Sequence, residues 1–174
     1  PPVATLDSHP AQRDPANSLP IVYTVVFSEP VVGFTAGDVQ ITAAGAPPTV
    51  NVLAADPPDG RHFLVQVEGV AADGAVTFDV PAGGVPDLAG NVNAASQAGD
   101  VTVVYDTTPP APPVILAPAD LSVRTNAVVR VAGTAEPGSR VEILDGETGI
   151  GSVFAAPGAG AWQFTTAERT DGQH

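Results

Sequence analysis

The chain has 174 residues, a formal net charge of −13 and a pI near 4.1. This acidity argues against nucleic acid and anionic membrane surfaces as partners, because both require clustered lysine and arginine. The absence of cysteine excludes disulfides, and the absence of lysine excludes Lys–Asn isopeptide cross-links.

The first 106 residues predict seven short β-strands and no helix. Apolar residues alternate with a period of two, for example over 63–67 and 76–80. Turn signals such as Asp59-Gly60 and Asp73-Gly74 separate the strands. The predicted strands are 3–6, 21–27, 39–42, 49–53, 62–68, 75–80 and 101–105. Seven alternating strands in about 100 residues predict an immunoglobulin-like β-sandwich.

A proline-rich linker follows over 107–113. Pro109 and Pro110 have no backbone N–H, so no sheet ladder can continue through them. The chain also begins Pro1-Pro2, which suggests a tandem array with one such joint at each module boundary. The prediction is therefore an all-β chain of two tandem modules, 1–106 and 114–174.

The strand count predicts an incomplete second module. Its predicted strands are 114–116, 127–132, 140–144, 151–155 and 161–165. The pair Asp171-Gly172 announces a further strand just before His174. A seven-stranded module would need two more strands. Truncation and supply of the missing strands from elsewhere both remain open at this stage.

Several motifs resemble bacterial immunoglobulin-like repeats. In the first module these include Phe27-Ser-Glu-Pro-Val31, Asp87-Leu-Ala-Gly-Asn91 and Tyr105-Asp-Thr-Thr-Pro-Pro110. The second module resembles a different repeat subfamily, through Val131-Ala-Gly-Thr-Ala-Glu-Pro-Gly-Ser139 and Trp162-Gln-Phe-Thr165. The resemblance implies a stalk or adhesin region of a large extracellular bacterial surface protein, often with calcium at the junctions between modules.

No catalytic motif is found in the sequence. The three histidines, His9, His62 and His174, lie far apart and lack partners at metal-ligand spacing. There is no nucleophile elbow and no phosphate-binding loop. His62 is expected to face solvent. Trp162 could stack on a sugar, but its place in a predicted strand favours a core or strand-edge residue. The prediction is a protein that is not an enzyme.

Calcium is the one candidate cofactor, because divalent cations are the natural counter-charge of so acidic a chain. Calcium takes 6–8 oxygen ligands from carboxylates, amides and carbonyls. If strand direction alternates, acidic loops gather at both ends of the first module. The candidate ligands are Glu29, Asp87 and Asn91 at the N-terminal end, and Asp14, Asp73, Asp106 and, from the second module, Glu136 at the other. Turn formation and solubility explain the same residues without a metal.

Two function classes follow. The first is a structural spacer that contacts the neighbouring modules of its own chain and is braced by its proline joint. The second is an adhesion module that binds a glycan or protein through the long loop 81–99. An accessory module of a secreted enzyme is a weaker third alternative.

Overall fold

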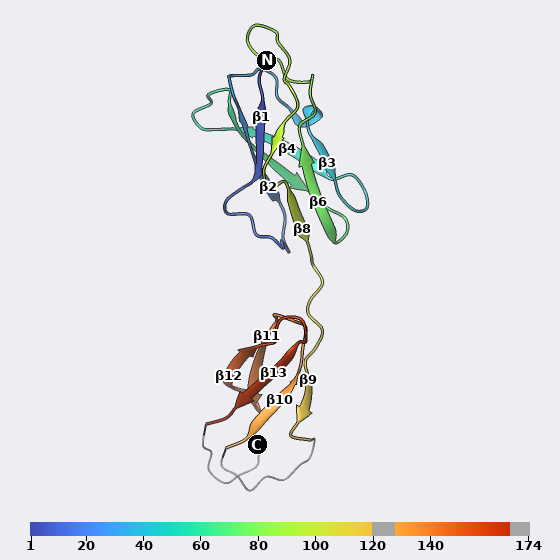
Figure 1. Ribbon diagram of the computed structural model, residues 1–174, viewed down its shortest axis with the longest axis vertical. Helices are drawn as coiled ribbons and strands as arrows, with labels where there is room; N and C mark the ends of the chain where they lie inside the picture. The colour runs from blue at the N-terminus through green and yellow to red at the C-terminus, as the bar shows by residue number, and fades with distance from the viewer. Residues whose placement is uncertain (120–127, 168–174) are drawn as a thin grey trace. The chain divides into compact units, whose positions relative to one another are not determined.

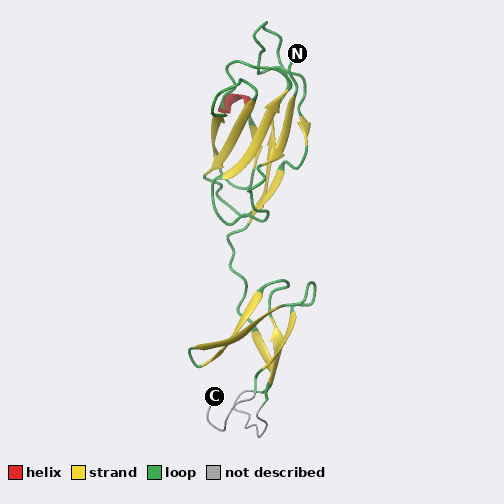
Figure 2. Ribbon diagram, turned by 90° about the vertical axis from the view of Figure 1, so that its left-hand side faces the viewer, coloured by secondary structure: helices red, strands yellow, loops and turns green. Residues whose placement is uncertain are grey.

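The computed structural model describes residues 1–119 and 128–167, and within them the chain is all-β apart from one 3₁₀ turn (Figure 1, Figure 2). Two compact units divide it: unit 1 runs from Pro1 to Thr108 and unit 2 from Pro109 to His174. The predicted all-β class is confirmed. None of the described segments forms a helix with the length and apolar character that crossing a membrane requires.

Unit 1 contains two sheets. The larger has five strands in the order β4-β5-β2-β1-β7, and the smaller has three in the order β3-β6-β8. Neighbouring strands are antiparallel except β1 and β7, which are parallel. The elements are β1 (Ala4–Ser8), β2 (Ile21–Phe27), η1 (Ala36–Asp38), β3 (Gln40–Thr42), β4 (Thr49–Ala54), β5 (His62–Glu68), β6 (Gly74–Asp79), β7 (Gln97–Ala98) and β8 (Thr102–Tyr105).

One hydrophobic core lies between these two sheets. Alternate residues of β2 face it, and Tyr23, Val25 and Phe27 are fully buried. The Tyr23 ring stacks on Phe78 of β6 with ring centroids 4.9 Å apart. Its hydroxyl donates to the Val76 carbonyl at 2.8 Å, and burial raises the pKa of Tyr23 well above its ordinary value. Burying each large apolar side chain contributes about 1.5–3 kcal/mol to stability. Two sheets that share one core are consistent with a β-sandwich.

One loop lies along a strand of each sheet in unit 1. In the larger sheet β7 pairs with β1 and is the edge strand, and Gly99, directly after β7, donates its N–H to the Leu6 carbonyl at 2.8 Å. Beside β8, Ala16 donates to the Val104 carbonyl and accepts from the Asp106 N–H, both at 2.8 Å. An uncovered edge strand offers a template for pairing with another chain. These loops therefore leave fewer free backbone groups on unit 1.

The long loop 81–99 is held together by one buried side chain, Asn93, which is 3% exposed. Its Oδ1 accepts three backbone N–H groups, and its Nδ2 donates to two carbonyls. The N–H donors are Gly83, Gly84 and Val85 at 2.9–3.0 Å, and the carbonyls are Pro81 at 2.9 Å and Ala94 at 3.1 Å. The loop also contains β7, a two-residue strand that the sequence analysis did not predict.

Unit 2 has a three-stranded sheet in the order β13-β10-β9 and a two-stranded sheet of β11 and β12. Trp162 is 6% exposed, which confirms that it is a core residue. Gly133 pairs with Trp162 across the sheet, and a Cβ at this glycine would come within 2.7 Å of the indole ring. The strands are β9 (Val114–Ala117), β10 (Arg130–Thr134), β11 (Arg140–Asp145), β12 (Thr148–Phe154) and β13 (Ala161–Thr165).

The predicted and observed strands of unit 2 differ most at the starts of β10 and β12, and β12 begins at Thr148 rather than at the predicted 151. The prediction placed β10 at 127–132, whereas it begins at Arg130. Val129 precedes the strand and exchanges two hydrogen bonds with Thr166, from its N–H to the threonine hydroxyl and from the threonine N–H to its carbonyl. Ala127 and the predicted turn at Asp171-Gly172 lie outside the described residues.

Candidate functional site

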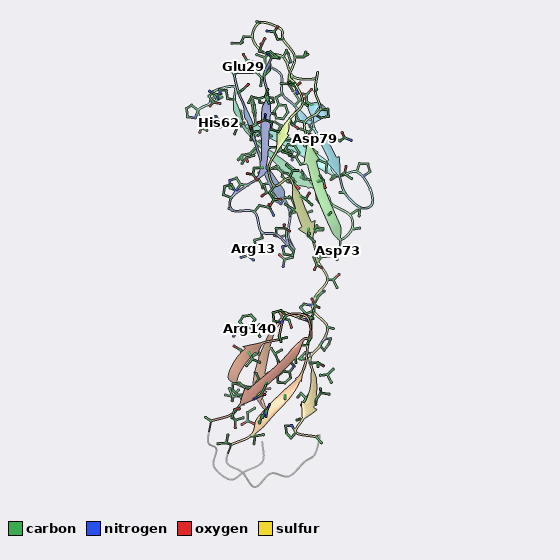
Figure 3. All side chains as sticks on the ribbon, viewed as in Figure 1. Arg13, Glu29, His62, Asp73, Asp79 and Arg140 are labelled. Atoms are coloured by element: carbon green, nitrogen blue, oxygen red, sulfur yellow. The ribbon has the colours of Figure 1, made fainter. Side chains whose placement is uncertain are left out.

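The end of β8 is tied to the start of β6 by one carboxylate. Gly74 pairs with Tyr105, so Asp73 lies beside the residues that leave β8. Its Oδ1 accepts the Thr107 N–H at 3.0 Å and the Thr107 hydroxyl at 2.8 Å, and its Oδ2 accepts the Thr108 hydroxyl at 2.7 Å. We call this arrangement of Asp73, Thr107 and Thr108 the exit clamp. Figure 3 shows Asp73 at the end of unit 1 where β6 begins.

The exit clamp stabilises the charged form of its carboxylate. The Thr108 hydroxyl makes the largest contribution, followed by the N–H and hydroxyl of Thr107, and together they lower the pKa of Asp73 below 3.8. Hydrogen bonds to an ionised acceptor are stronger than those between neutral groups. A further bond joins the Thr108 N–H to Asp106 Oδ1 at 2.9 Å. Both threonines that precede the proline run are therefore fixed to unit 1.

The proline run itself is exposed. Residues 109–113 are solvent-exposed, and four of the five are proline. Prolines in such a run favour an extended, semi-rigid backbone. The pair at the start of the chain differs, because Pro2 is buried and its carbonyl accepts the Ala94 N–H at 2.8 Å. The two Pro-Pro pairs thus have different surroundings despite their similar sequence.

Asp14 lies at the same end of unit 1 as the exit clamp. Its Oδ1 accepts the Val104 N–H at 2.9 Å, next to the Ala16 bridge that covers the β8 edge. Asp14, Asp73 and Asp106 are therefore gathered around the end of β8, where alternating strand direction predicted them. All three carboxylates accept hydrogen bonds from the chain, which gives each a structural role that needs no metal.

Asp87 and Asn91 form a turn within the loop 81–99. Asp87 accepts the Asn91 side-chain amide, the Asn91 N–H and the Ala89 N–H, each at 2.8 Å. The Asn91 side chain is the largest cause of the lowered pKa of Asp87. Gly90 has φ of 87°, in the left-handed region that glycine adopts without a steric penalty, and it completes this turn.

Glu29 lies at the end of unit 1 opposite to Asp73 and the exit clamp (Figure 3). Its carboxylate is 3.7 Å from the amino group of Pro1. Two residues further on, Val31 forms an isolated bridge with Asp87, which brings these two acidic loops together. Calcium binding by Glu29, Asp87 and Asn91 stays a prediction.

Asp59 and His62 form a second compact turn. Asp59 Oδ1 accepts the N–H groups of His62 and Arg61 at 2.9 and 2.8 Å, and its Oδ2 lies 2.5 Å from His62 Nδ1. The backbone bond from His62 is the largest cause of the lowered pKa of Asp59. The His62 side chain is 52% exposed, as predicted for a solvent-facing residue. Its polar contacts are those of a turn.

Glu136 belongs to unit 2, where its backbone carbonyl accepts the N–H and hydroxyl of Ser139 at 3.0 and 2.7 Å. The predicted pairing of Glu136 with Asp106 across the linker therefore remains a prediction. Over residues 1–119 and 128–167, no three His, Asp or Glu side chains are grouped so that they could hold a metal ion.

Sequence reasoning missed Asn93 and the exit clamp. Asn93 carries no visible signal beyond its place in a long loop. The clamp had a partial signal, because Asp73 was already placed near the end of the strand at 101–105. Comparison with family models, curated proteins and solved structures found no match to this chain.

Proposed function

We propose that this chain is a non-catalytic spacer from the stalk of an extracellular bacterial surface or adhesion protein, built from immunoglobulin-like modules. The exit clamp is the observation that supports the proposal. In a spacer, the direction in which the backbone leaves one module determines where the next module lies. The clamp fixes Thr107 and Thr108, and the exposed proline run begins directly after them.

The sheet arrangement of unit 1 supports the immunoglobulin-like part of the proposal. Two sheets enclose one core, and seven of its eight strands occur where a seven-stranded module was predicted. The covered edge of β8 also suits a repeated module, because free edges in a tandem array invite pairing between neighbours.

Backbone relaxation tests this proposal in the Asp73→Ala variant. In the wild-type chain, we expect the ¹⁵N order parameters of Thr107 and Thr108 to approach the rigid-backbone value of about 0.85. Loss of the clamp should lower them toward about 0.6. Glu68→Gln is the matched control, because it removes one exposed charge at the end of β5 and leaves the clamp intact. Unchanged order parameters in Asp73→Ala would contradict the proposal.

A second candidate function is adhesion through the loop 81–99. The observation that favours it is Leu88, which is 80% exposed at the tip of the turn held by Asp87. An exposed leucine on a preorganised turn loses little conformational freedom when it binds. A glycan and host-protein array tests this candidate, and binding should disappear in Leu88→Asp. An array without hits would favour the spacer.

A further inference from the structure

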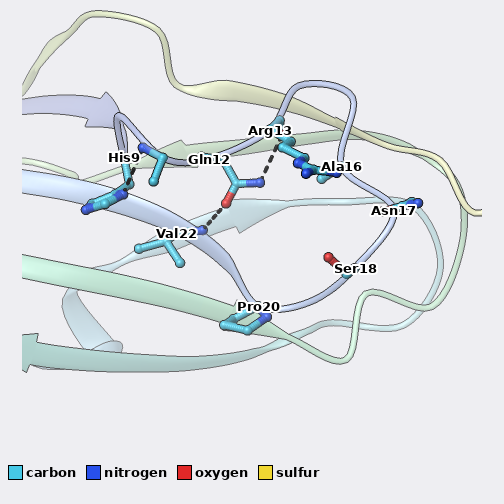
Figure 4. Close-up of a pocket in the computed structure, with 9 residues that line it drawn as sticks. His9, Gln12, Arg13, Ala16, Asn17, Ser18, Pro20 and Val22 are labelled. Atoms are coloured by element: carbon cyan, nitrogen blue, oxygen red, sulfur yellow. Dashed lines mark hydrogen bonds between the residues drawn. The ribbon is translucent and has the colours of Figure 1, made fainter.

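A hollow of about 300 Å³ lies beside the loop that joins β1 to β2 (Figure 4). Its polar lining side chains come from His9, Gln12, Arg13, Asn17 and Ser18. None of its lining residues is acidic, although the chain has a net charge of −13. The hollow therefore differs in charge from most of the surface of this acidic protein.

The wall of the hollow is preorganised by Gln12. Its side-chain oxygen accepts the Val22 N–H at 2.8 Å, and its side-chain nitrogen donates to the Arg13 carbonyl at 2.9 Å (Figure 4). These bonds tie the loop to β2. The neighbouring Asp14 does not line the hollow, because its carboxylate is bound to the Val104 N–H on β8. Arg13 thus lines the hollow, whereas its acidic sequence neighbour does not.

The remaining polar groups are mainly hydrogen-bond donors. Within the described residues, the Arg13 guanidinium has no ion-pair partner. His9 Nδ1 accepts the Ala11 N–H at 3.2 Å, so the neutral ring carries its proton on Nε2, which is a donor. Asn17 and Ser18 are exposed, and each can both donate and accept. A ligand that fits this set has an anionic group and hydroxyls.

We propose that this hollow binds a carboxylate-bearing sugar of the hexuronate type. Arginine recognises a carboxylate with two parallel N–H donors, and the Asn17 and Ser18 side chains match sugar hydroxyls in both donating and accepting. One cation suits a monoanion better than a phosphate dianion on so acidic a protein. The volume is at the small end for ligand sites, which suits one sugar residue.

The direct test is a ¹H–¹⁵N titration of the full chain with sodium D-glucuronate. We expect saturable shifts confined to His9, Arg13 and Ser18 and their neighbours. Arg13→Gln should weaken binding by about tenfold or more, because it removes a charge-assisted hydrogen-bonding group. Arg61→Gln is the matched control, since it removes the other cation of residues 1–106, and it should change affinity less than about twofold.

Three results would overturn the proposal. The absence of saturable shifts up to about 100 mM ligand would exclude even a weak site. Equal weakening by Arg13→Gln and Arg61→Gln would show general charge attraction. If D-glucose bound as tightly as D-glucuronate, the carboxylate would not be recognised. If acetate bound as tightly, the sugar would not be recognised. The site is independent of the exit clamp, so its failure would leave the spacer proposal standing.

Discussion

Replacing Asn93 with alanine should clearly destabilise unit 1, because the Asn93 side chain makes five hydrogen bonds within the loop 81–99. The variant leaves the buried N–H of Val85 without its acceptor, which costs about 1–3 kcal/mol. Gly83 and Gly84 are exposed, so water can replace their bonds, and each loss costs about 0.5 kcal/mol. The sum is about 2–4 kcal/mol, and the expected fall in melting temperature is about 10–20 °C.

The two units offer separate probes for this measurement. Trp162, the only tryptophan, belongs to unit 2, whereas the buried Tyr23 reports on unit 1 through near-ultraviolet circular dichroism. Urea unfolding should show the tyrosine transition moving in Asn93→Ala while the tryptophan transition stays in place. Asn51→Ala, on the exposed side of β4, is the control and should change stability by less than about 0.5 kcal/mol. A tyrosine transition that moves as little in Asn93→Ala as in Asn51→Ala would contradict the stabilising role of the Asn93 side chain.

Three further predictions concern the core, acid sensitivity and calcium. Tyr23→Phe removes the donor to the Val76 carbonyl and should cost about 1 kcal/mol in urea unfolding; an unchanged midpoint would contradict it. Asp59, Asp73 and Asp87 have pKa values below 3.8, so the unfolded chain binds protons first and stability should fall as the pH drops below about 4. Urea midpoints that stay level from about pH 5 to pH 2.5 would contradict this. If calcium binds at the end of a unit, a chelator should lower the melting temperature or broaden the range of interdomain angles seen by small-angle scattering. If neither measurement changes, the calcium prediction is wrong.

The strands that were predicted best are those with one fully buried face. β2 and β5 have the predicted ends because the alternation of β2 between core and outer face is unbroken and that of β5 is clear around Val65 and Val67. β7 was missed because its two residues, Gln97 and Ala98, are both exposed and show no alternation. The predicted start of β10 was wrong because Val129 has the β-branched apolar side chain typical of strands but precedes the strand.

The candidate site was predictable in position but not in its bonding. Alternating strand direction placed Asp73 near Asp106, and that expectation depends only on the number of strands. The bonds from Thr107 and Thr108 to Asp73 depend on the register of β6 against β8, in which Gly74 lies opposite Tyr105. A register is set by packing on both faces of the sheet, so a sequence pattern does not determine it.

If the proposed function is right, the exit clamp controls the direction in which the chain leaves unit 1. Because the chain has no cysteine, Glu68→Cys and Glu147→Cys place one spin label on each unit, both at exposed positions. Double electron–electron resonance then gives the distribution of distances between the labels. We expect a clearly broader distribution when Asp73→Ala is added than in the doubly labelled chain with the clamp intact. Equal distributions with and without Asp73→Ala would contradict it.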